Sequence, residues 1–288
     1  MLRSFVSYLK MIKAEHTLFA LPFALASMAL AAEGAPSIRS IIWILFCMVC
    51  ARSGAMGFNR WADAKIDAKN PRTANREIPK GRISKNAAAL FTAMSFILFI
   101  VGAAQLNRLS LILSPAPIAV FIIYSYSKRF TILCHLLVGL ALGLAPVGAW
   151  IAITGAFSVS ILYLAFGVMV WTCGFDLLYS LFDEDFDRKE GLYSLPAGFG
   201  KIKTLLVARY MHFLAFILFF MHGARFSLGL FYFGGLIIAG AILLYEHYLV
   251  SAYGFAKLNA AFFSMNAVVS IILFVATVAD ITVYGYRG

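Results

Sequence analysis

Long apolar runs are the feature that most constrains how this chain can fold. LFALPFALASMALAA (18–32), IIWILFCMVCARSGAMGF (41–58) and AAALFTAMSFILFIVGAA (87–104) are examples. Each approaches the roughly 20 apolar residues that an α-helix needs to cross a bilayer. The runs do not alternate polar and apolar residues, as the strands of a membrane barrel would. They therefore predict an all-α integral membrane protein.

Composition agrees with this prediction, because 62% of the residues are hydrophobic and only 13% are charged. Soluble domains are about 45–50% apolar and about 25% charged. We expect residues 1–288 to form a single transmembrane domain with nine spans. The expected spans are 17–33, 40–58, 87–105, 109–127, 131–153, 158–182, 204–222, 227–245 and 258–279.

The distribution of basic residues predicts the orientation in the membrane. With nine spans, the N-terminus and the loops 59–86, 128–130, 183–203 and 246–257 lie on one side, and they hold most of the 24 Lys and Arg residues. An excess of Lys and Arg marks the cytoplasmic side. We therefore expect a cytoplasmic N-terminus and an outside C-terminus. On this interpretation the net charge of +11 reflects topology and anion binding, not a nucleic-acid partner.

Acidic residues gather in two short segments, 63–77 and 176–190, which hold most of the 13 in the chain. In the first, polar residues recur at intervals of four; in the second, the intervals are three, four and four. Residues three or four apart lie on one face of a helix. Each segment therefore predicts a polar stripe where a span leaves the membrane. The first stripe is Asn59, Asp63 and Asp67, and the second is Asp176, Tyr179, Asp183 and Asp187.

Carboxylates in such stripes repel one another near low-dielectric surroundings, so positive charge must stand between them. Oxygen ligands suit a hard divalent cation, and Mg²⁺ is favoured where a substrate phosphate completes its coordination. Basic residues that could bind that phosphate follow the stripes or end the fourth span on the same side. They are Arg72, Arg76, Lys128, Arg129 and Lys189. The alternative is a solvated loop, which accounts well for Lys65, Lys69, Lys80 and Lys85.

Both stripes resemble the signatures of a known family. NRWADAKIDAKNPRTANR (59–76) and DLLYSLFDEDFD (176–187) resemble the two motifs of the UbiA superfamily of intramembrane aromatic prenyltransferases. YSYSKRF (124–130) and HTLFALPFAL (16–25) are similar to further family segments, so the resemblance covers nearly the whole chain. It is strongest to the 4-hydroxybenzoate polyprenyltransferases. Arg60 follows Asn59, where the commonest form of the first motif has Asp.

The resemblance implies Mg²⁺-dependent transfer of a polyprenyl group from polyprenyl diphosphate to an aromatic acid, in respiratory quinone biosynthesis. The expected acceptor is 4-hydroxybenzoate. The alternative is 1,4-dihydroxy-6-naphthoate, because 183–200 and 246–266 also resemble a UbiA-like branch of menaquinone biosynthesis through futalosine. The implied location is a bacterial inner membrane, with the active site on the cytoplasmic side. No obligate protein partner is inferred.

The family roles carry over to matching positions. Asp63, Asp67, Asp183 and Asp187 would hold Mg²⁺, with Asn59 assisting, and the five basic residues named above would bind the diphosphate. Asp176 or Tyr179 would orient the acceptor, and His247 is a further candidate to contact it.

An ion-coupled transporter is the alternative from another functional class, since intramembrane carboxylates mark ion paths. The predicted position of the aspartates at one membrane face, not at the midplane, argues against it.

Overall fold

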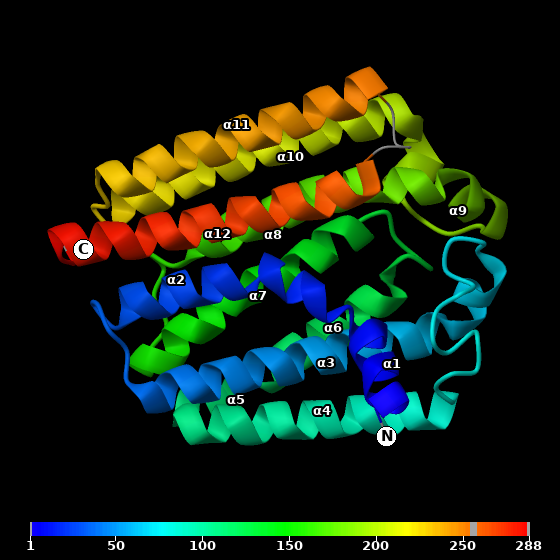
Figure 1. The fold of residues 1–288 in the computed structure, drawn as a ribbon, viewed down its shortest axis with the longest axis horizontal. Helices are drawn as coiled ribbons and strands as arrows, with labels where there is room; N and C mark the ends of the chain where they lie inside the picture. The colour runs from blue at the N-terminus through cyan, green and yellow to red at the C-terminus, as the bar shows by residue number, and fades with distance from the viewer. Residues whose placement is uncertain (1, 254–257, 287–288) are drawn as a thin grey trace.

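The structure, a computed structural model, describes residues 2–253 and 258–286, and every regular element in those ranges is helical (Figure 1). The elements are α1 (Leu2–Ile12), η1 (Ala14–Phe19), α2 (Leu21–Ala31), α3 (Ile38–Lys69), α4 (Lys85–Leu106), α5 (Arg108–Leu113), α6 (Pro115–Ser127), α7 (Cys134–Thr154), α8 (Leu162–Ser180), η2 (Leu181–Asp183), α9 (Glu184–Glu190), α10 (Leu195–Arg225), α11 (Leu230–Tyr253) and α12 (Leu258–Tyr284). The all-helical prediction is therefore confirmed for the described part of the chain.

Eight helical stretches in the described residues are long and apolar enough to cross a membrane. They overlap the second to the ninth predicted spans. The first predicted span, 17–33, is instead divided between η1 and α2, and the segments Val6–Phe19 and Leu21–Ala31 are bent by 49°. Pro22 explains the new start, because proline suits the first turn of a helix and has no N–H to continue the preceding one. A ninth span therefore stays a prediction, and residues 254–257 of the predicted loop 246–257 lie outside the described residues.

The long helices run side by side, with the connections gathered at their ends. Figure 1 shows α9 and the segment between α3 and α4 at one end of the bundle, with α1 toward the same end and the C-terminus at the opposite end. This arrangement agrees with the predicted grouping of the N-terminus and the long loops. Which end faces the cytoplasm stays a prediction.

Helix α8 forms the centre of the bundle and sets the position of the site. Trp171 is fully buried on it, and α7 and α10 pack against it. Close approach of α7 depends on small residues: a Cβ added to Gly143 would lie 2.6 Å from the carbonyl oxygen of Ala165. Glycine at a helix contact lets two backbones approach in a membrane. Gly139, at the other end of the GLALG segment (139–143), lies as close to the backbone of Met169.

Two helix starts near the site follow from local sequence. Ser84 caps α4 by accepting a hydrogen bond from the backbone N–H of Ala87, and Ser194 caps α10 through Ala197. Five residues into α10, the backbone of Gly200 has φ 78° and ψ 171°, which bends the helix there. A positive φ of this kind favours glycine, which has no Cβ to clash.

A buried polar cluster joins the last three helices away from the acidic stripes. His212 of α10 and His247 of α11 are 3.0 Å apart between Nδ1 and Nε2. Asn266 of α12 donates a 2.6 Å hydrogen bond to Glu246 of α11, whose side chain is fully buried. Polar side chains that bond across helices hold membrane bundles together, and this cluster serves that purpose for α10, α11 and α12.

Candidate active site

A cavity of about 430 Å³ lies among α3, α6, α7 and α8, and both predicted stripes line it. The predicted site residues on its wall are Asn59, Asp63, Asp67, Arg72, Arg76, Lys128, Asp176, Tyr179, Asp183 and Asp187. Arg129 does not line the cavity but pairs with Asp63, which does. Lys189 is exposed and is not on the wall, so its role stays a prediction without a supporting contact.

The first stripe lies on one face of α3, which continues eleven residues past the predicted span end at 58. Asp63 is 2% exposed, and two cations from the end of α6 neutralise it. Lys128 Nζ lies 2.5 Å from one carboxylate oxygen, and Arg129 Nη2 lies 2.9 Å from the other. Asn59 is one turn away, with its Nδ2 3.4 Å from Asp63. The YSYSKRF segment therefore meets the first stripe directly.

Asp67 ends the first stripe, and the chain after α3 turns back onto it. Arg76 Nη1 donates a 2.7 Å hydrogen bond to Asp67 Oδ1, and Thr73 Oγ1 bonds the Asp67 carbonyl at 3.1 Å. The second carboxylate oxygen, Oδ2, is buried and has no hydrogen-bond partner in the part of the chain that the structure describes. A buried carboxylate oxygen without a partner is costly, which marks it as a position for a ligand.

Arg72 joins the two stripes across the mouth of the cavity. Its Nε and Nη2 both donate to Asp183, the Nε bond being 2.8 Å, and its Nη1 donates to the Tyr179 hydroxyl at 2.7 Å. Asn70 adds a 2.9 Å bond to Asp183. Burial lowers the pKa of Arg72, but the hydrogen bond and charge of Asp183 outweigh it, so the pKa is raised above its ordinary value. The guanidinium therefore stays charged.

The second stripe is not one continuous α-helix, which corrects the regular spacing expected for it. The 3-10 turn η2 separates α8 from α9, so Asp176 and Tyr179 belong to α8 while Asp187 belongs to α9. All of its members still line the cavity. Asp176 has a partner that the sequence did not indicate: His135 at the start of α7, with Nδ1 2.8 Å from Asp176 Oδ2.

The cavity wall also holds cations to which the sequence analysis gave no role. Lys13, Arg52 and Arg60 line it, together with Tyr124. Arg52 Nη2 donates to the carbonyl of Lys13 at 3.3 Å, while its Nε is buried with no partner in residues 2–253 and 258–286. Among the described residues, no acidic side chain forms an ion pair with Arg52. An arginine inside a predicted span was the available signal, since such residues are rare and functional.

The residues present fit a magnesium ion that shares its ligands with a substrate. Within the described ranges, no three His, Cys, Asp or Glu side chains converge closely enough to hold a metal by themselves. Mg²⁺ seldom uses an all-protein cage and is usually bound by one or two carboxylates plus substrate phosphates. Carboxylates from both stripes face one cavity, and Asp67 Oδ2 is without a partner there. The donor set is therefore suitable for Mg²⁺ with a diphosphate.

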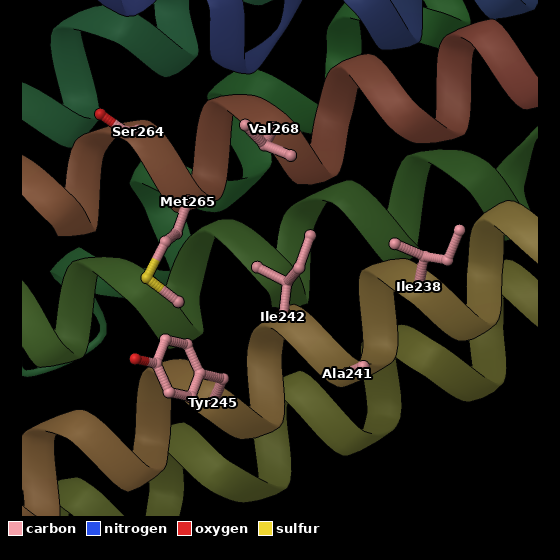
Figure 2. A pocket seen from close by; sticks show the side chains of 7 residues that line it. All are labelled: Ile238, Ala241, Ile242, Tyr245, Ser264, Met265 and Val268. Atoms are coloured by element: carbon pink, nitrogen blue, oxygen red, sulfur yellow. The ribbon is translucent and has the colours of Figure 1, made fainter.

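A second hollow, of about 370 Å³, lies between α11 and α12 (Figure 2). Its wall is Ile238, Ala241, Ile242, Tyr245, Ser264, Met265 and Val268. None of these side chains carries charge at neutral pH, so the hollow offers nothing to balance a diphosphate. His247 lies on α11 too, but it contacts His212 and does not line the charged cavity.

Comparison with known proteins gives one consistent result. Residues 20–268 match the UbiA prenyltransferase family. A 4-hydroxybenzoate octaprenyltransferase of Vibrio atlanticus is 30% identical over 226 residues, 78% of each chain. One of Pseudomonas fluorescens is 29% identical over 262 residues, 90% of this chain and 86% of that one.

Solved structures agree with these relatives. An apo UbiA homologue from Aeropyrum pernix has a TM-score of 0.84 and 30% identity, covering 93% of this chain and 98% of that one. A UbiA homologue from Archaeoglobus fulgidus bound to GPP and Mg²⁺ has a TM-score of 0.70, covering 96% and 100%. Because the latter is only 18% identical, its likeness concerns the fold.

Proposed function

The chain belongs to the UbiA prenyltransferase family, and on that basis we propose that it transfers a polyprenyl group from polyprenyl diphosphate to a ring carbon of an aromatic acid. One observation carries the proposal: two acidic stripes 120 residues apart in sequence line one cavity together with Arg72, Arg76 and Lys128. Such a surface suits a diphosphate with a divalent cation. It would be hard to explain as two independently solvated loops.

The diphosphate would bind at the mouth, where the charges are densest. Asp63, Asp67, Asp183 and Asp187 would hold Mg²⁺, with Asn59 assisting. When bound, Mg²⁺ would supply charge stabilisation for the leaving diphosphate. Arg72, Arg76, Lys128 and Arg129 would take the remaining negative charge, with Lys189 at the exposed rim. Support comes from the ion pairs that already place four of these cations at the stripes, and from a fold shared with a homologue that binds GPP and Mg²⁺.

The acceptor would bind at the cationic side of the cavity, with its carboxylate at Arg52. A guanidinium without an ion-pair partner in a low-dielectric site is stabilised by an incoming anion, and Arg pairs with carboxylates through two hydrogen bonds. A carboxylated aromatic ring matches this requirement. The names of the relatives favour 4-hydroxybenzoate, in respiratory quinone biosynthesis. The other candidate is 1,4-dihydroxy-6-naphthoate, which also carries a carboxylate.

The chain's own groups would then direct the chemistry. As the allylic C–O bond breaks, negative charge grows on the diphosphate, and preorganised cations stabilise it most at that moment. The ring carbon attacks the allyl cation, a C–C bond forms, and the ring C–H proton passes to the carboxylate of Asp176. Apolar residues on the same wall, such as Phe19 and Phe175, exclude water that would quench the cation.

The proposal includes a location. The stripes lie at the end of the bundle that carries the long basic loops, so we place the active site at the cytoplasmic face of a bacterial inner membrane, with the N-terminus on that side. The ion-coupled transporter loses its support, because family membership accounts for the acidic stripes.

Turnover of radiolabelled geranyl diphosphate by the purified protein tests the proposal. We expect Mg²⁺-dependent product with 4-hydroxybenzoate or with the naphthoate, compared side by side. Asp67→Asn and Asp183→Asn should each abolish most of it. Asp185→Asn is the matched control, because Asp185 is an exposed acid beside the stripe that does not line the cavity. Equal activity in all three variants would refute the assignment.

A further inference from the structure

Asp176 differs from the other acidic residues of the cavity wall in what it contacts. Asp63, Asp67 and Asp183 each form an ion pair with Lys or Arg. Asp176 is instead hydrogen-bonded to His135, whose Nδ1 lies 2.8 Å from Asp176 Oδ2. A carboxylate already paired with a cation is a poor proton acceptor, since the cation stabilises its charged form. Among the described residues, Asp187 forms no ion pair with Lys or Arg either, but it is assigned to the metal, so Asp176 is the wall carboxylate left for proton transfer.

The two hydrogen bonds of His135 fix which ring nitrogen carries the proton. The backbone N–H of Leu195, at the start of α10, donates to Nε2 at 3.4 Å. A ring nitrogen that accepts a hydrogen bond has no proton. Nδ1 therefore carries a proton, which it donates to Asp176 Oδ2 at 2.8 Å. His135 thus connects the start of one helix to a carboxylate of another.

His135 and Asp176 differ in how deeply their side chains are buried, and this difference suits a positioning role for one and substrate contact for the other. The side chain of His135 is 7% exposed, whereas that of Asp176 is 33% exposed, and both line the cavity. The carboxylate therefore keeps surface that a substrate can reach, while the imidazole is held behind it. A histidine fixed by a second hydrogen bond orients its partner more rigidly than a lone donor would.

We propose that His135 is a positioning residue, which holds the Asp176 carboxylate in the orientation that accepts the ring proton of the prenylated acceptor. The inference rests on the proposed function and deepens it. In the step it serves, the new C–C bond has formed, the ring C–H bond breaks, its electron pair restores the aromatic ring, and the proton passes to an Asp176 oxygen. The diphosphate has left with the electrons of the C–O bond.

Other ionisable groups surround the pair and define its setting. They are Tyr124 of α6, Cys134 of α7, Cys173 and Tyr179 of α8, and Asp187 of α9. None is a Lys or Arg, and Arg72, Arg76, Lys128 and Arg129 each pair with another carboxylate. The Nδ1–H of His135 is thus the donor that the structure gives to Asp176.

Variants that move a single donor atom test this role. His135→Asn keeps an amide N–H near the position of Nδ1, His135→Gln places its amide farther out, and His135→Phe keeps a ring without a donor. With geranyl diphosphate and 4-hydroxybenzoate, we expect His135→Asn to retain most of the wild-type kcat. His135→Phe and His135→Gln should lose about 10- to 100-fold, the usual cost of removing an orienting partner, with KM for geranyl diphosphate unchanged.

The kinetic isotope effect with ring-deuterated 4-hydroxybenzoate distinguishes a role in proton transfer from a purely structural role, which would not change it. When ring deprotonation becomes slow, a primary deuterium isotope effect should appear on kcat in His135→Phe and be absent in the wild type and in His135→Asn. Should His135→Phe fail to fold, His135→Gln carries the same comparison. The naphthoate replaces 4-hydroxybenzoate if the wild type prefers it.

Two results would overturn the inference, and they differ from each other. An active wild type with equal kcat and no isotope effect in all three variants would remove the role of His135 alone. A wild type inactive with both acceptors would remove the proposed function, and this inference with it.

Discussion

Replacing Arg52 by Met should weaken recognition of the acceptor carboxylate and leave diphosphate binding and stability unchanged. Arg52 lines the cavity, its Nε has no partner among the described residues, and its hydrogen bond to the Lys13 carbonyl is 3.3 Å long. If the acceptor carboxylate accepts two hydrogen bonds from this guanidinium, each contributes about 1.5–3 kcal/mol. At the lower end the sum is about 3 kcal/mol, which corresponds to an affinity change of about 100-fold.

The assay compares two acceptors, 4-hydroxybenzoate and phenol, which differ in the carboxylate. The ratio of their kcat/KM values is measured in the wild type and in Arg52→Met with geranyl diphosphate at saturation. The two rings differ in intrinsic reactivity, but this difference is the same for both enzymes and therefore cancels when their ratios are compared. We expect the variant to lose about 100-fold of the preference for 4-hydroxybenzoate, with KM for geranyl diphosphate unchanged.

Stability gives an internal check on the same variant. No acidic side chain in the described part of the chain forms an ion pair with Arg52, so its removal breaks none, and Tm in detergent should stay close to that of the wild type. Arg209→Met is the matched control: Arg209 also lies inside a predicted span but bonds Ser251, away from the cavity. An unchanged acceptor ratio in Arg52→Met would refute the carboxylate assignment.

Three further outcomes are expected. Arg72→Leu should raise KM for geranyl diphosphate by about 10-fold, because it removes one charge-assisted contact to phosphate; an unchanged KM would exclude that contact. Gly143→Ala should lower Tm, at a cost of about 1–3 kcal/mol, because the new Cβ would meet a backbone oxygen 2.6 Å away. Gly148→Ala, where nothing lies within 4 Å, should leave Tm unchanged, and equal Tm values would contradict the packing argument. Glu246→Leu should destabilise the protein by about 1–3 kcal/mol, whereas Glu246→Gln still accepts the hydrogen bond from α12 and should remain close to wild type in a thermal melt.

Sequence predicted the spans well because lipid imposes one simple requirement. Each crossing must satisfy its backbone within a helix and cover itself with apolar side chains, so hydropathy alone indicates where most helices lie. Helix ends were predicted less well. The predicted span ended at 58, but α3 continues to Lys69, because a helix with a polar stripe continues after its apolar run stops.

Periodicity also predicted which acidic residues share a cavity, since residues three and four apart must lie on one helix face. It could not show how they are paired. His135 is 41 residues from Asp176, and neither residue carries a local signal of that contact. Arg52 was overlooked for a related reason: an isolated arginine in an apolar run reveals its role only when the structure shows that it lines the cavity and, among the described residues, forms no ion pair.

The bond network of Arg72 has a kinetic consequence. Arg72 holds Asp183, a carboxylate that the proposed catalytic metal requires. Binding of the metal with its substrate therefore competes with the Arg72–Asp183 ion pair, which joins the two loops. The measured affinity for the substrate would then reflect how much more strongly Asp183 binds the metal than it binds Arg72. It would not give the strength of either interaction alone. On loading, Arg72 would exchange Asp183 for a phosphate oxygen, and after transfer the reverse exchange would restore the pair with Asp183 as the pyrophosphate leaves.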